Sequence, residues 1–275
     1  MTTHVIILAQ GAQTRLPMFE LPHTPKQLVC LQIPVATGIH KYGVSILTRT
    51  LRQLALLLAN EVHVTTVVGW PSIAEHYAKH PVIVSSEDGQ THFGVGTRLT
   101  VRYMPEFVSL PDPGNSSLRG LGEYFDLKRE RTGTVLSSDR CVVLLGDVVY
   151  SWDCMRMLLD PAAAIRFVGT SDLSTSGGEL WGIAWDTSRT VMLETLREAL
   201  ARHPKVDDVY QCGQMRRWWW AVRDVAIAAC LPAEERGYMV CDDYTFDLDK
   251  PADIRLLSER APEVEADDRR NGVTW

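Results

Sequence analysis

Hydrogen-bond donors and positive charge gather just after a short apolar stretch near the N-terminus. Residues 5–9 (VIILA) are long enough for a buried strand and too short for a core helix. Gly11 marks a sharp turn of the backbone, and Thr14, Arg15 and Lys26 follow it. Backbone amides, a hydroxyl and cations at the end of one strand are a common means of binding a polyphosphate. The stretch therefore predicts a phosphate site.

Carboxylates follow two later segments. The run Cys141–Leu145 is fully apolar, which is typical of a central strand, and it ends in Gly146-Asp147. Open α/β sheets place their ligands at this carboxyl edge, although Gly-Asp is also ordinary turn chemistry. Asp247 and Asp249 alternate, so on a strand they would point the same way and repel one another unless a cation or donors lie between them.

Together these stretches resemble the signature of the nucleotidyltransferase superfamily, the sugar-phosphate and alcohol-phosphate NTP transferases. That family's first strand runs into L-A-A-G-x-G-T-R-L and then P-K-x-L; here residues 8–16 read LAQGAQTRL and residues 25–28 read PKQL. Gln10 and Gln13 stand where the family has alanine and glycine. Gly146-Asp147 resembles the Gly-Asp after its central strand, and residues 247–254 resemble its late D-x-D-T-P-x-D-L, with Lys250 for the threonine and isoleucine for the final leucine.

The resemblance implies an enzyme that transfers NMP from an NTP to a phosphorylated small acceptor, such as a sugar phosphate, with release of pyrophosphate. Arg15 would hold the departing phosphates and Lys26 would offset charge on the α-phosphate. Asp147, with Asp247 or Asp249, would bind Mg²⁺. The residues expected to bind nucleotide are Ala9, Gln10, Gly11, Ala12, Gln13, Thr14, Arg15, Lys26, Asn115 and Ser116.

The elements that must position these residues alternate between strand and helix. Further strands are expected at 62–68, 82–85, 97–104, 165–168 and 180–185, and helices at 45–58, 72–79, 118–128, 152–160, 187–201, 213–229 and 251–260. This alternation implies parallel pairing. The fold class predicted is α/β, a mixed, mainly parallel sheet flanked by helices, and the resemblance makes it Rossmann-like or GT-A-like with three layers.

The chain is expected to form one domain over residues 1–260, with nucleotide over its N-terminal half and acceptor over its C-terminal half. Residues 261–275 are charged and are expected to be a flexible tail. Residues 32–42 are interpreted as a loop insertion beside the site, and residues 87–96 as a polar loop.

Composition argues against several classes of protein. A net charge of −6 provides no general basic field for nucleic acid or an anionic membrane. The apolar runs fall short of the ~20 residues that cross a bilayer, and the N-terminus lacks a signal-peptide pattern, so a cytoplasmic protein is expected. The six cysteines form no Cys-x-x-Cys pair, which argues against a zinc site and a disulfide scaffold. Trp218-Trp219-Trp220 cannot all face one side of a helix, so at least one is expected at a lid or at a subunit contact of a homo-oligomer.

Two other functions stay open at this stage. A GT-A-type glycosyltransferase using a nucleotide sugar would explain Asp247 and Asp249 but gives no reason for Arg15 and Lys26, because it has no triphosphate tail to hold. A non-catalytic nucleotide-binding relative is suggested by Gln10, Gln13 and Lys250. Released pyrophosphate separates the transferase from both.

Overall fold

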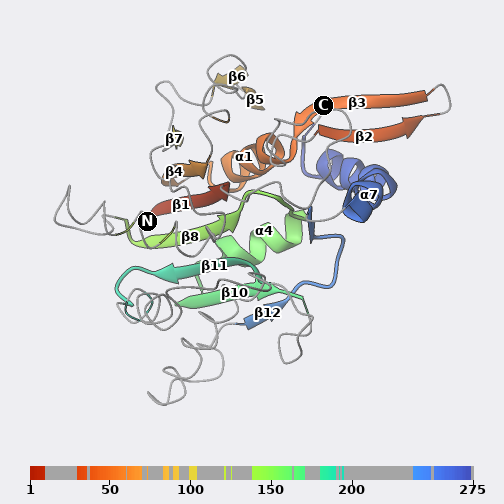
Figure 1. Cartoon of the computed structure of the whole chain (residues 1–275). Coiled ribbons are helices and arrows are strands. Elements are labelled where there is room, and N and C mark those ends of the chain that lie inside the picture. The colour runs from red at the N-terminus through yellow and green to blue at the C-terminus, as the bar shows by residue number, and fades with distance from the viewer. Residues whose placement is uncertain are drawn as a thin grey trace.

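The structure is a computed structural model, and Figure 1 shows a central sheet with helices packed against it. The residues it describes are 1–9, 30–35, 38–59, 61–69, 73, 83–86, 89–92, 99–103, 121, 125, 138–162, 164–170, 180–189, 192, 194, 238–248 and 251–273.

The central sheet has seven strands in the order β12-β10-β11-β8-β1-β4-β7. Their bounds are β1 Thr2–Ala9, β4 Val62–Gly69, β7 Leu99–Tyr103, β8 Arg140–Leu145, β10 Ile165–Gly169, β11 Leu180–Asp186 and β12 Tyr238–Val240. β11 runs antiparallel to both of its neighbours, and every other pairing in this sheet is parallel. The predicted mixed, mainly parallel sheet is confirmed.

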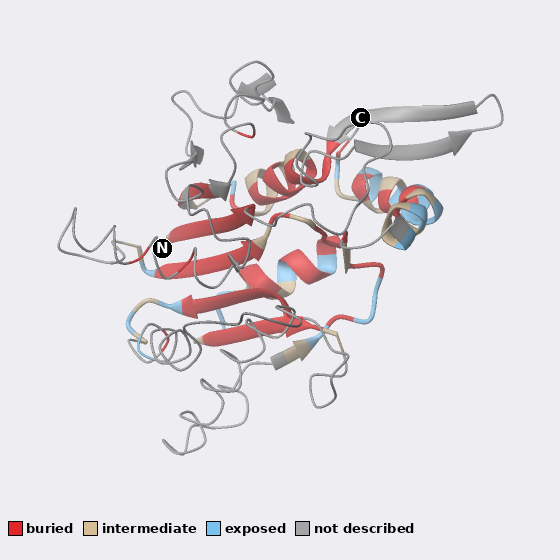
Figure 2. Ribbon diagram, viewed as in Figure 1, coloured by how far each residue is buried: buried red, intermediate tan, exposed pale blue. Residues whose placement is uncertain are grey.

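β1 and β8 form the buried middle of the sheet (Figure 2). Val5, Ile6 and Ile7 are completely buried, as are Val142 and Val143 on the neighbouring strand. Because parallel central strands are covered on both faces, their sequences are continuous apolar runs rather than alternating ones. This is why the two strands were predictable from hydrophobicity alone.

Helices α1 (Ile46–Leu57) and α4 (Trp152–Leu159) cover the same face of the sheet. The side-chain oxygens of Ser45 and Ser151 cap them, accepting hydrogen bonds from backbone N–H groups three residues on, at 3.1 and 2.9 Å. On the opposite face, Phe125 packs edge-on to Trp185, with ring centroids 6.2 Å apart. The sheet is therefore flanked on both faces, as predicted.

A second, smaller core lies between helix α7 (Pro251–Arg270) and a two-stranded ladder of β9 (Val148–Val149) and β13 (Phe246–Asp247). The expectation of a flexible tail from residue 261 is wrong over residues 261–270, which continue the helix. The reason is a buried face at helical spacing, formed by Leu257, Ala261, Val264 and Asp268. The charged residues between these positions made the helical spacing of the buried face difficult to recognise in the sequence. The single-domain division at residue 260 stays a prediction.

Residues 32–42, expected as a loop, and part of the loop expected at 87–96 belong to β-hairpins, whereas the strand expected at 82–85 is confirmed as β5 (Ile83–Ser86). β2 (Cys30–Val35) pairs antiparallel with β3 (Gly38–Ser45), and β5 (Ile83–Ser86) with β6 (Gly89–His92), each pair forming a separate two-stranded sheet. Two-stranded ribbons of this kind tolerate the proline and glycines that indicated loops. The β2–β3 ribbon lies beside α7 (Figure 1).

The helix expected at 187–201 does not begin at Thr187, because residues 187–189 form a turn. Met192 and Glu194 are helical; residues 195–201 and the helix expected at 213–229, with its three tryptophans, lie outside the described residues.

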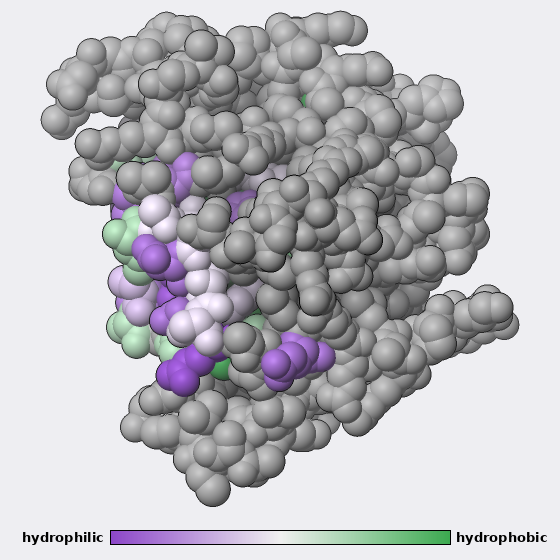
Figure 3. Space-filling model, turned by 90° about the vertical axis from the view of Figure 1, so that its left-hand side faces the viewer, coloured by the Kyte–Doolittle hydropathy of each residue, from purple (hydrophilic) through white to green (hydrophobic). Residues whose placement is uncertain are grey.

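Within the described ranges, only Met1 and Val240 are large hydrophobic side chains that are exposed. The described part of the face in Figure 3 is mostly hydrophilic or intermediate, with smaller hydrophobic patches. None of the described helices has the length and apolar character needed to cross a membrane.

Candidate active site

The carboxyl ends of β1 and β8 meet at one edge of the sheet. The backbone N–H of Gly146 donates to the carbonyl of Leu8 at 2.8 Å, which ties the turn after β8 to the end of β1. A Cβ atom at Gly146 would lie 3.0 Å from the Cβ of Ala9 and 3.1 Å from the Leu8 carbonyl oxygen. Glycine therefore permits this close approach. The turn that carries Asp147 is fixed next to the point where the chain leaves β1.

The structure brings Asp147 and Asp247 to neighbouring positions on the β9–β13 ladder. Asp247 pairs with Val148, and the backbone N–H of Leu248 donates to the carbonyl of Asp147 at 3.1 Å. Both aspartates are partly exposed, whereas Val148 and Leu248 are completely buried. Two carboxylate-bearing residues far apart in the chain thus share the edge of the sheet where the phosphate-binding stretch begins.

Of the other predicted site residues, Ala9 is described: it is the last residue of β1 and is buried. The rest of the predicted set lies outside the described ranges: Gln10, Gly11, Ala12, Gln13, Thr14, Arg15, Lys26, Asn115, Ser116 and Asp249.

The buried side chain of Tyr150 supports the turn that carries Asp147, and the sequence analysis did not predict this role. Its hydroxyl donates to the carbonyl of Trp181 at 2.6 Å and accepts from the backbone N–H of Leu145 at 2.8 Å. Burial, together with the nearby Cys154 and Asp147, raises the pKa of Tyr150 well above its ordinary value, so the hydroxyl stays protonated. A tyrosine just after an apolar strand that ends in Gly-Asp was the available signal, because buried tyrosines need a partner for their hydroxyl.

A hydrogen-bonded group joins the start of α4 to the segment before β13. Ser151 donates its hydroxyl to Asp243, and its backbone N–H donates to the Thr245 hydroxyl at 2.9 Å. The backbone N–H of Thr245 donates to Asp243 at 2.8 Å. Burial opposes ionisation of Asp243, but these hydrogen bonds outweigh it and lower its pKa.

Two buried free thiols lie beside this group. A hydrogen bond with Cys241, together with burial, raises the pKa of Cys154 well above its ordinary value, so this thiol stays protonated. The described cysteines, 141, 154 and 241, are all free and buried.

Within the described part of the chain, no three His, Cys, Asp or Glu side chains gather as a metal site. Asp147 and Asp247 lie at adjacent backbone positions, Asp247 opposite Val148 and Asp147 bonded through its carbonyl to Leu248, and the third predicted carboxylate, Asp249, is not described. Asp147 and Asp247 therefore place two carboxylates at the edge of a mainly parallel sheet where open α/β folds bind their ligands.

No family model and no curated protein sequence matches the chain. Several solved structures resemble it at low sequence identity. The inositol-1-phosphate CTP transferase of T. maritima is 12% identical, with a TM-score of 0.44, over 93% of this chain and 95% of that one. A 4-diphosphocytidyl-2C-methyl-D-erythritol synthase is 12% identical, with a TM-score of 0.46, over 94% and 98%. A nucleotide-diphospho-sugar transferase, so titled, from Desulfovibrio desulfuricans G20 is 11% identical, with a TM-score of 0.46, over 98% and 95%.

All three of these similarities have TM-scores below 0.5.

Proposed function

We propose that the chain is a nucleotidyltransferase, which moves NMP from an NTP to a phosphorylated small acceptor and releases pyrophosphate. The observation that carries this proposal is the meeting of Asp147, Asp247 and the end of β1 at one sheet edge. A sequence rich in phosphate-binding side chains, Thr14, Arg15 and Lys26, leaves β1 at that same edge.

The residues present fit a magnesium ion. Mg²⁺ prefers carboxylate oxygens and is commonly bound by one or two carboxylates, with substrate phosphates and waters completing the shell. Asp147 and Asp247 are partly exposed carboxylates at adjacent backbone positions, so either could supply such a ligand, and Asp249 is a further candidate. Such an ion would neutralise charge on the triphosphate.

In the proposed reaction, a phosphate oxygen of the acceptor attacks the α-phosphorus of the NTP. The new oxygen–phosphorus bond forms as the bond between the α-phosphorus and the bridging oxygen breaks, and that oxygen leaves with pyrophosphate. No protein nucleophile is needed, so the chain contributes positioning and charge. Arg15 would hold the β- and γ-phosphates, and Lys26 would meet the charge that grows on the α-phosphate. The nucleotide would lie along residues 9–15, with Asn115 and Ser116 near its base and ribose.

The test is pyrophosphate release from purified protein with Mg²⁺, the four NTPs and dTTP, and a panel of sugar and alcohol phosphates. Acceptor-dependent release that EDTA abolishes would establish the reaction and identify both substrates. Nucleoside diphosphate released from a nucleotide sugar, without pyrophosphate, would instead indicate a glycosyltransferase. NTP binding without turnover would indicate a non-catalytic relative.

Lys26→Ala is the sharpest variant for this assay. Loss of a preorganised charged contact costs ~3–4 kcal/mol of barrier, so turnover should fall by ~10²–10³-fold with the fold intact. Arg260→Gln, which removes an exposed cation that pairs with Glu263, is the matched control and should retain full turnover. A Lys26→Ala protein that turns over like the control would contradict the assigned role.

A further inference from the structure

A completely buried ion pair joins helix α1 to helix α7. Arg49 is 2% exposed and Asp268 is 0% exposed. Nε of Arg49 donates to both carboxylate oxygens at 3.1 and 2.9 Å, and Nη2 donates to Oδ1 at 2.7 Å. The same guanidinium donates to the Tyr244 hydroxyl at 3.2 Å and to the carbonyl of Tyr150. Burial disfavours the charge, but Asp268 and Tyr244 outweigh it and raise the pKa of Arg49.

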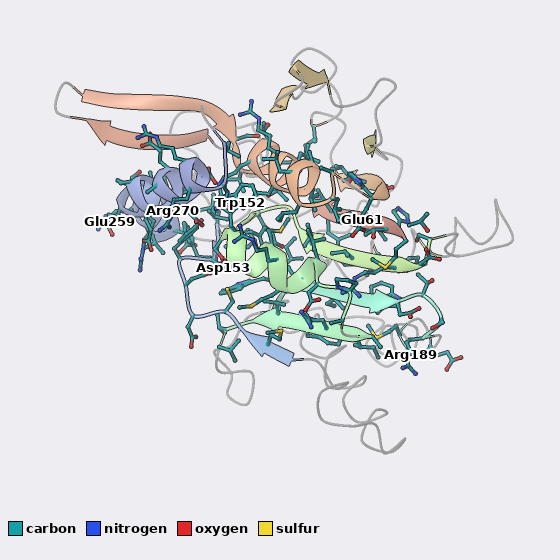
Figure 4. The ribbon with its side chains drawn as sticks, turned by 180° about the vertical axis from the view of Figure 1, so that it is seen from behind. Glu61, Trp152, Asp153, Arg189, Glu259 and Arg270 are labelled. Carbon is teal, nitrogen blue, oxygen red and sulfur yellow. The ribbon has the colours of Figure 1, made fainter. Side chains whose placement is uncertain are left out.

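The last turns of α7 bind the same region through a second set of contacts. Trp152 lies between α4 and α7 (Figure 4), and its indole N–H donates to Asp268 at 2.7 Å. The Tyr244 hydroxyl donates to Asp267 at 2.6 Å. We refer to Arg49, Trp152, Tyr244, Asp267 and Asp268 together as the clamp.

The clamp binds one end of the β9–β13 ladder. The candidate metal ligands lie at the other end. Tyr150 directly follows β9, and Tyr244 comes two residues before β13. Asp147 and Asp247 lie at the opposite end, where Leu248 bonds to Asp147. Each strand has only two residues, and a two-stranded pair of this length is not stable by itself. Its position is set by what surrounds it: Val149 and Leu248 pack in the small apolar core against α7, and the clamp adds hydrogen bonds at one end of the ladder.

We propose that the clamp is a positioning element for Asp147 and Asp247, and that helix α7 thereby belongs to the active site without touching substrate. The part of this proposal that concerns catalysis rests on the proposed nucleotidyltransferase function. A buried Arg–Asp pair is a poor source of net stability compared with apolar packing, but its geometry is directional. Here it fixes two chain segments, at residues 150 and 244, relative to one helix.

Amide hydrogen exchange of the full-length protein tests the positioning without requiring activity. Asp268→Asn keeps the size of the side chain and removes its charge, which leaves Arg49 buried and unpaired. Exchange of residues 244–248 should become at least about tenfold faster, while amides of β1 keep their protection. Tyr244→Phe removes only the hydroxyl that links Arg49 to Asp267 and should produce a smaller increase in the same segment. If Asp268→Asn does not fold, Tyr244→Phe decides the outcome.

Arg260→Gln, which breaks an exposed ion pair on α7, is the control and should leave exchange at 244–248 unchanged. The proposal is overturned if folded variants exchange at 244–248 like this control. It is also overturned if exchange rises equally in β1, because the clamp would then stabilise the whole fold rather than the ladder.

Titration with Mn²⁺ as a probe of the carboxylate pair connects positioning to function. Asp268→Asn should weaken Mn²⁺ binding per folded molecule by about tenfold relative to Arg260→Gln, whereas a merely structural role would lower the melting temperature and leave that affinity unchanged. A wild-type protein that neither binds Mn²⁺ nor releases pyrophosphate would defeat the proposed function alone, because the exchange experiment requires neither.

Discussion

The edge of the sheet at β1 and β8 and the ladder of β9 and β13 meet at the candidate site, yet they are held in different ways. β1 and β8 are parallel neighbours whose residues 5–9 and 141–144 are apolar and buried. β9 and β13 have two residues each; they pack in a small apolar core and also receive buried polar groups from α1 and α7. The sheet edge is held by extensive apolar packing, whereas the ladder combines a small apolar core with directional hydrogen bonds.

This difference separates two physical tasks. Apolar burial is non-directional and scales with area, so it stabilises the sheet without fixing any single contact. A buried charged hydrogen bond contributes little net stability, but it costs much when one partner is lost. Substitutions in the first region should therefore weaken the whole fold, and substitutions in the second should also displace the carboxylates.

The largest expected effect comes from Arg49→Met. It leaves Asp268 buried without its cation, which typically costs ~3–5 kcal/mol of unfolding free energy. Urea unfolding of this variant and of Arg260→Gln measures the difference, and the exposed control should change by less than about 1 kcal/mol. Equal stabilities would mean that the pair does not support the fold, and the contrast between the two regions would fail.

Ile7→Ala tests the apolar region. Ile7 is completely buried in β1 between β4 and β8, so its truncation should cost ~2–5 kcal/mol through lost transfer energy and a cavity. Unlike Arg49→Met, it should speed exchange broadly across the sheet and leave the affinity of the folded protein for Mn²⁺ unchanged. A selective loss of Mn²⁺ affinity would show that the two regions are not separable.

The same contrast explains what the sequence could predict. The predictions of strands around residues 5–9 and 141–145 are confirmed, because a continuous apolar run is itself a pattern typical of a buried strand. The structure places Asp147 and Asp247 at adjacent backbone positions, while their assignment to one site, which rested on the order of three motifs in a family pattern, stays a prediction.

The clamp could not be predicted, because its partners are far apart in the sequence and no local pattern pairs them. Asp268 lies in a run of charged residues, and nothing in the sequence distinguishes this buried carboxylate from its more exposed neighbours. Residues 257, 261, 264 and 268 share a helix face, but only two of them, 257 and 264, are large and apolar. The helix was therefore expected to end at residue 260, and the polar half of the site was missed with it.

Tyr150→Phe should have an intermediate effect that concentrates at the junction of the two regions. The variant keeps the buried ring but leaves the carbonyl of Trp181 and the backbone N–H of Leu145 without the hydroxyl, at a cost of ~1–3 kcal/mol. Urea unfolding measures the loss, and pyrophosphate release tests whether the turn at Asp147 has moved. Full stability would imply that water replaces the hydroxyl, and Tyr150 would then not be needed to hold the turn.

The smallest effect is expected from substitution of Asp243, and it appears in how the free energy of unfolding depends on pH. Burial opposes ionisation of this carboxyl, but hydrogen bonds from Ser151 and Thr245 lower its pKa in the folded state below its ordinary value of 3.8. Between the two pKa values the unfolded chain binds more protons, so the stabilisation is complete above pH 3.8 and is lost as the pH falls through the folded pKa. Asp243→Asn should therefore make the acid limb of stability less steep, as measured by urea unfolding across that range. Asp242→Asn removes the neighbouring carboxylate and serves as the control. An equally steep limb in Asp243→Asn would show that the bonds joining α4 to the segment before β13 do not depend on the charge of Asp243.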